Sequence, residues 1–174
     1  MDLQSLKELF IEQLEDALDA EKQLVKAIPD MVDAAKTPEL RSAFEEHLTQ
    51  TKGQVGRLEQ VFSVIGEPAK EGSCDAMEGL IKEAKSMIKA DGQAAVVDAG
   101  LVAAAQKVEH YEMATYGTVR TWANGNYSGL GERGSRTPGG QRTSPLMKRP
   151  TGSSRRITIL SPAQSMTVPG SPCR

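Results

Sequence analysis

The sequence has few cysteines, few aromatic residues and no long hydrophobic run. Its two cysteines, Cys74 and Cys173, form no CxxC pair, and no basic leader precedes an apolar segment at the N-terminus, which reads MDLQSLKELF. No window approaches the roughly 18 apolar residues that a membrane span requires. We therefore expect a cytoplasmic protein with reduced thiols and no membrane partner.

The charge of the chain changes abruptly near Ala123. Residues 1–123 carry 13 Lys and Arg against 22 Asp and Glu, whereas residues 124–174 carry eight basic residues and one acid. The second segment also holds six of the nine prolines and eight of the sixteen glycines. This shift predicts a domain over 1–123 and a disordered Gly/Pro/Arg-rich tail over 124–174. Because no aromatic residues interleave its arginines, we expect no specific nucleic-acid partner.

The first segment is predicted to be all-α. Apolar residues recur every three or four positions over residues 3–28, after which Pro29 should kink or end the helix. A second helix is predicted from Pro38 to Ile65, with Thr37 at its cap and Gly66 at its end. A short helix over 76–90 and a third long helix over 94–122 follow. Short connections favour an up-down antiparallel bundle, and three long helices leave one wall for a fourth helix or a second chain.

Polar side chains interrupt the apolar seam of each long helix. They are Glu21 on the first, His47, Thr51 and Gln54 on the second, and Glu109 and Glu112 on the third. Burying a carboxylate costs several kcal/mol unless it is paired or bound to metal, so a shared metal site would explain the pattern. Carboxylate and imidazole ligands suit iron or manganese. The alternative is that each Glu lies at the seam edge with its carboxylate in water.

Four stretches resemble the YciF/YciE family of bacterial stress proteins. They are DAEKQLVKAIP (19–29), EEHLTQTKGQVGRLEQVF (45–62), CDAMEGLIKEA (74–84) and AAAQKVEHYEMATYGT (103–118), in the family's order and spacing. The resemblance implies a ferritin-like bundle, usually dimeric, that holds a di-iron-type centre and takes part in stress responses. Family members often have acidic residues where this chain has Thr49, Gln50 and Thr51, which leaves His47 and Gln54 as weak ligand candidates.

The family's fourth long helix, of the type ETLDEEKATDxKL, has no counterpart in this chain. Reverse translation of TSPLMKRPTGSSR (residues 143–155), read from the third base of each codon, can give LALDEEADGKLA, which is close to that helix. We therefore hypothesise that the tail is out-of-frame sequence. Loss of this helix would expose the apolar seam and leave the metal site incomplete.

Three functions remain open at this point, of which the weakest is non-specific nucleic-acid association through the basic tail. The first is a ferritin-like stress protein, a homodimer, with two iron or manganese ions per intact bundle held by Glu21, His47, Gln54, Glu109 and Glu112, and with impaired binding in this chain. Oxidase- or peroxide-type chemistry is then possible in intact relatives, although no substrate pocket is evident. The second is a non-catalytic dimeric helical scaffold in which the same residues form a polar core layer.

Overall fold

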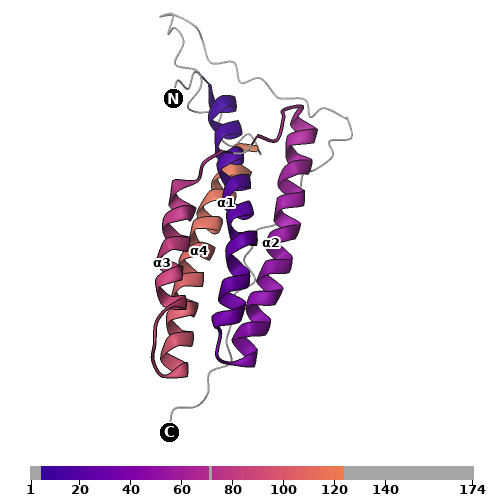
Figure 1. Ribbon diagram of the computed structural model, residues 1–174. Coiled ribbons are helices and arrows are strands. Elements are labelled where there is room, and N and C mark those ends of the chain that lie inside the picture. Colours follow the sequence, from indigo (N-terminus) through magenta and orange to yellow (C-terminus); the bar gives the residue numbers. More distant parts are fainter. Residues whose placement is uncertain (1–4, 71, 124–174) are drawn as a thin grey trace, which may run out of the picture.

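The computed structural model describes residues 5–70 and 72–123, which form a four-helix arrangement (Figure 1). The helices are α1 (Leu6–Ala34), α2 (Pro38–Ile65), α3 (Asp75–Ile88) and α4 (Ala94–Ala123). Two antiparallel hairpins, α1–α2 and α3–α4, lie side by side, and α1 packs against each of the other three helices. The all-α bundle predicted from the sequence is confirmed, with three long helices and one short one among the described residues.

Local sequence signals account for most helix ends. Ser5 begins α1 with a capping box, in which its hydroxyl accepts from the Glu8 amide and the Glu8 carboxylate accepts from the Ser5 amide. Gly66 ends α2 in the left-handed conformation, with φ of 75°. The expected interruption at Pro29 does not end α1, which continues to Ala34. Met31 and Ala34 are buried beyond the proline, so packing of this last turn offsets the lost hydrogen bond.

The turn between α1 and α2 is anchored by a residue from α4. Thr37 occupies the cap position of α2 as expected, but its side chain makes no capping hydrogen bond. Instead the buried carboxylate of Asp98 accepts from the backbone amides of Lys36 at 2.8 Å and Thr37 at 2.9 Å. These hydrogen bonds lower the pKa of Asp98, although burial works in the opposite direction. The start of α2 is therefore fixed to α4.

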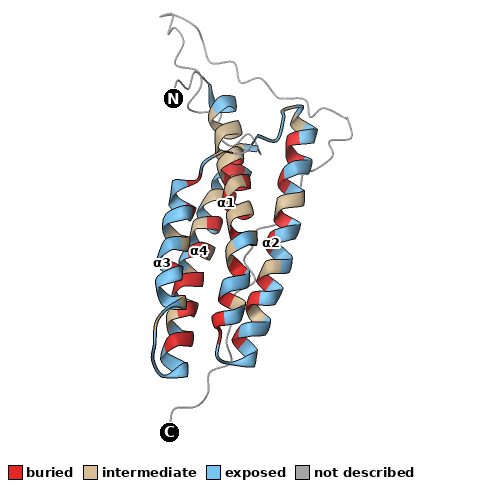
Figure 2. Cartoon of the chain, viewed as in Figure 1, coloured by how far each residue is buried: buried red, intermediate tan, exposed pale blue. Residues whose placement is uncertain are grey.

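A layer of buried polar residues separates two apolar clusters in the core. Figure 2 shows buried residues along the whole length of the bundle. One cluster is formed by the second half of α1, the start of α2, α3 and the first half of α4, and includes Phe44, Met77 and Leu101. The other lies at the opposite end and includes Leu18 and Phe62. The buried polar residues between these clusters along the helices are Glu21, His47, Thr51, Gln54 and Glu112. The bundle thus places its polar layer near mid-height.

Several predictions fall outside the described residues. These are the disorder of residues 124–174, their out-of-frame origin, and the lack of a fourth long helix after Trp122. Within the described ranges, no helix is both long and apolar enough to cross a membrane.

Candidate metal centre

One imidazole and two carboxylates meet between α2 and α4. His47 Nε2 lies 3.4 Å from Glu109 Oε1 and 3.9 Å from Glu112 Oε2. One donor atom from each of the three residues lies within 4.8 Å of the other two. Glu109 and Glu112 are three positions apart on α4, so both face the same side of that helix. Three donors of the kinds that bind hard or borderline divalent cations therefore converge at one point.

Burial keeps the charged forms of these groups unfavourable when no cation is present. Burial and repulsion from Glu21 and Glu109 raise the pKa of Glu112 to about 10. Burial likewise raises the pKa of Glu21 to about 7, against a hydrogen bond from Tyr116 that lowers it. The pKa of His47 is lowered by burial, so its imidazole is neutral near pH 7 and offers a lone pair.

The orphaned atoms of this layer fit a bound cation. Glu21 Oε2, His47 Nε2 and both carboxylate oxygens of Glu112 are buried and have no hydrogen-bond partner. A proton shared between the two carboxyl groups can satisfy only part of this set. Because an unpaired buried polar atom costs about 1–3 kcal/mol, a positively charged partner at this point would stabilise the group. A divalent ion at this point would accept lone pairs from all three residues.

The structure treats the five predicted ligands differently. It brings His47, Glu109 and Glu112 together. Glu21 lies next to this cluster, where it interacts with Glu112, but it is not one of the three converging residues. Gln54 is buried on the same face of α2, two turns beyond His47, and its Oε1 has no partner.

Sequence reasoning missed the partner of Glu21. Tyr116 on α4 donates its hydroxyl to Glu21 Oε1 at 2.7 Å, and both side chains are buried. Tyr116 follows Glu112 by four positions and so lies on the same helix face, which is the one signal that pointed to it. His110, by contrast, is exposed and contacts the backbone oxygen of Gln106, outside the cluster.

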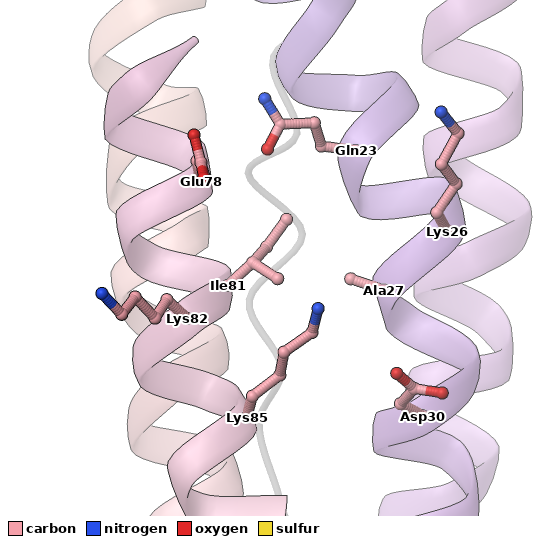
Figure 3. A pocket seen from close by; sticks show the side chains of 8 residues that line it. All are labelled: Gln23, Lys26, Ala27, Asp30, Glu78, Ile81, Lys82 and Lys85. Carbon is pink, nitrogen blue, oxygen red and sulfur yellow. The ribbon is translucent and has the colours of Figure 1, made fainter.

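A second feature is an open groove between α1 and α3 with a volume of about 360 Å³ (Figure 3). Its lining carries both charge signs over a floor that includes Ala27 and Ile81, and it contains none of the candidate ligands. The lining residues are Gln23, Lys26, Ala27, Asp30, Glu78, Ile81, Lys82 and Lys85. With cations and carboxylates mixed around its rim, the groove selects no particular ligand class.

Comparison with known proteins places the chain in a family. A family model described as a domain of unknown function, DUF892, matches residues 5–126. The chain belongs to this family. It is 44% identical over 124 residues to the protein YciF of Escherichia coli K12, a stretch that covers 71% of this chain and 75% of YciF. The resemblance seen in the sequence motifs is confirmed.

Two solved structures of related proteins are similar in fold to this chain. The crystal structure of the E. coli stress protein YciF matches with a TM-score of 0.69 and 42% identity, covering 71% of this chain and 79% of that one. YcfI from Rhodopseudomonas palustris matches with the same TM-score and 40% identity, covering 72% and 80%. Both likenesses support a helical bundle.

Proposed function

We propose that this protein binds a divalent cation, iron or manganese, between α2 and α4. The observation that carries the proposal is the convergence of His47, Glu109 and Glu112, in which His47 Nε2 and both oxygens of Glu112 are buried without a hydrogen-bond partner while Glu109 is half-buried. Glu21 would serve as a further ligand from α1. Carboxylates and a neutral imidazole match the preferences of these metals. Bound iron would supply redox reactivity toward oxygen or peroxide.

The chain's own residues would hold and orient such an ion rather than perform acid–base chemistry. Glu112 would give up its proton on binding, since a ligand carboxylate must be ionised. His47 is already neutral and needs no deprotonation. The two apolar clusters on either side of the polar layer would limit the access of water along the bundle axis.

The biological setting that we propose follows from the family. YciF of E. coli is described as a stress protein, and we propose the same kind of role here, in the cytoplasm and as a homodimer. An intact bundle would hold two ions, with Gln54 as a weak candidate for a second position. This chain, which offers only three converging donors plus Glu21 among its described residues, would hold fewer.

A pair of histidine variants tests the metal site. We expect titration of the full chain with Mn²⁺ to show stoichiometric binding that His47→Ala abolishes. His110→Ala is the matched control, because that imidazole is exposed and lies outside the cluster. Equal binding by the protein and by H47A would contradict the proposal.

Metal content tests the number of bound ions, whereas the coding DNA sequence tests whether the tail is out of frame. Iron and manganese should be measured per chain in this protein and in a version with the reading frame restored after Trp122. About two ions in the restored version, with fewer in this chain, would support a broken two-ion site. Absence of metal from both would favour the scaffold function, in which the polar layer is structural.

A further inference from the structure

The two oxygens of Glu21 lie in different environments. Oε1 accepts the hydroxyl hydrogen of Tyr116 at 2.7 Å, a short distance typical of a hydrogen bond to a carboxylate. Oε2 is buried and has no partner. Glu21 and Tyr116 are 1% and 6% exposed, so solvent does not reorganise around this pair. Tyr116 therefore holds one oxygen, while the carboxyl group is left with the neighbouring Glu112 as its other interaction partner in the polar layer.

Tyr116 also shares its helix face with the converging carboxylates. It lies one turn beyond Glu112 on α4, so the helix that carries Glu109 and Glu112 also fixes a side chain from α1. Without this hydrogen bond, only packing and the neighbouring Glu112 would orient the Glu21 carboxylate. Hydrogen bonds of this kind orient metal-bound carboxylates in proteins.

We propose that Tyr116 is a positioning residue for the metal site: it occupies Oε1 of Glu21 and so directs Oε2 toward the cation. This inference rests on the proposed function, since it requires that a cation binds. Tyr116 itself touches no ion. It acts through Glu21 alone.

A second tyrosine on α4 provides a matched control. The hydroxyl of Tyr111 lies 3.0 Å from Cys74 Sγ and donates to Asp16 at 3.2 Å, which ties the start of α3 to α1 and α4. Tyr111 precedes Tyr116 by five positions, a rotation of about 140° around the helix, so its hydroxyl faces away from the cluster. Tyr111→Phe removes the same atom as Tyr116→Phe at a place that this proposal does not use.

The experiment compares Mn²⁺ affinity of the full chain with those of Y116F and Y111F. We expect Y116F to bind about 10- to 100-fold more weakly, as is usual when an orienting partner of a ligand is removed. Y111F should bind like the unchanged protein. The visible spectrum of bound Co²⁺ should change in Y116F and not in Y111F, because only the former alters the ligand geometry. Unchanged affinity and spectrum in Y116F would overturn the proposal.

A double-mutant cycle with Glu21→Ala tests whether Tyr116 acts through Glu21. In that background, Y116F should weaken binding no further, whereas losses that multiply would overturn the proposal. If Y116F alone does not fold, the metal affinities of E21A and the E21A/Y116F double variant still show whether Tyr116 acts only through Glu21. The double variant is expected to fold because removing both partners leaves no orphaned carboxylate. If the unchanged protein binds no Mn²⁺ or Co²⁺, the proposed function is wrong and this inference loses its basis. If the unchanged protein binds the metal and Y116F binds it equally well, only this inference is wrong.

Discussion

Replacing Glu112 by Gln should stabilise the metal-free protein. The side chain is 2% exposed, neither of its oxygens has a donor, and its pKa is raised from near 4.5 to about 10. In the unfolded chain this carboxyl is ionised at pH 7, so folding must take up a proton. With 1.36 kcal/mol per pKa unit, that uptake costs about 3 kcal/mol at pH 7 and about 1 kcal/mol at pH 5. Gln carries no charge and avoids this cost.

The sign of the pH dependence follows from the raised pKa. An acid with a raised folded-state pKa destabilises the fold above its unfolded pKa, and the penalty disappears as the pH falls toward that value. His47, with its lowered pKa, works in the opposite direction in acid. Because Glu112 contacts His47 and is coupled to Glu21, the replacement also changes their titration, so the test rests on the direction of the pH dependence: a larger gain at pH 7 than at pH 5.

Urea unfolding in EDTA, followed by circular dichroism at pH 5 and pH 7, measures the difference. We expect E112Q to be more stable by about 3 kcal/mol at pH 7 and by about 1 kcal/mol at pH 5. Glu59→Gln removes a charge from the exposed face of α2 and should change stability by no more than about 0.5 kcal/mol. A destabilised E112Q, or a gain of equal size at both pH values, would refute the reasoning.

Adding metal should reduce the difference in the free energy of unfolding between E112Q and the unchanged protein. Mn²⁺ at about 100 times its dissociation constant would stabilise the unchanged protein by about 2.7 kcal/mol. E112Q, which lacks the ligand carboxylate, should gain nothing. The residue that weakens the apo fold is then the residue that the ion requires.

Three further substitutions test the packing that positions the site. Asp98→Ala removes the acceptor of two backbone amides and should cost about 2–4 kcal/mol at pH 7 by urea unfolding. Because the pKa of Asp98 is lowered, this cost should be present above its usual value of 3.8 and shrink in more acid solution. Gly72→Ala would place a Cβ 3.1 Å from the backbone of α1 and should lower the free energy of unfolding by about 1 kcal/mol. Gly100→Ala should leave that free energy unchanged or raise it by up to about 1 kcal/mol. The reason is that the atom facing Gly100 is the Sδ of Met87, a flexible and partly exposed side chain that can move; thermal unfolding that ranks these two glycine variants in the reverse order would contradict this argument.

Helix positions could be predicted from the sequence because their signals are local. The limits of α2 follow from Pro38 at its first turn and Gly66 at its end, and both are features of neighbouring residues. The end of α1 could not be placed from the sequence, since the effect of Pro29 depends on packing of Met31 and Ala34. Helix propensity gives the cost of a proline within a helix, but only the tertiary structure shows the packing that offsets this cost.

The site could be predicted in part, because helical periodicity gives the face of a residue but not its height against another helix. Glu109 and Glu112 were placed on one face correctly, and His47 and Gln54 share a face of α2. Only His47 lies level with the two carboxylates. The offset between α2 and α4 is set by the hairpins and by contacts such as that of Asp98, which link residues more than 60 positions apart.

Two buried carboxylates on α4, those of Asp98 and Glu112, differ in their hydrogen bonds. Burial of a carboxylate in this fold therefore does not by itself leave it without donors. Asp98 is 7% exposed, accepts two backbone amides and has a lowered pKa. Glu112 is 2% exposed, has no donor and has a strongly raised pKa. A chain that satisfies one buried carboxylate fully with its own amides has the means to satisfy another. Folding is therefore opposed at Glu112 and favoured at Asp98. The contacts of Asp98 explain why that carboxylate is buried, whereas the burial of Glu112 is what the proposed cation would explain.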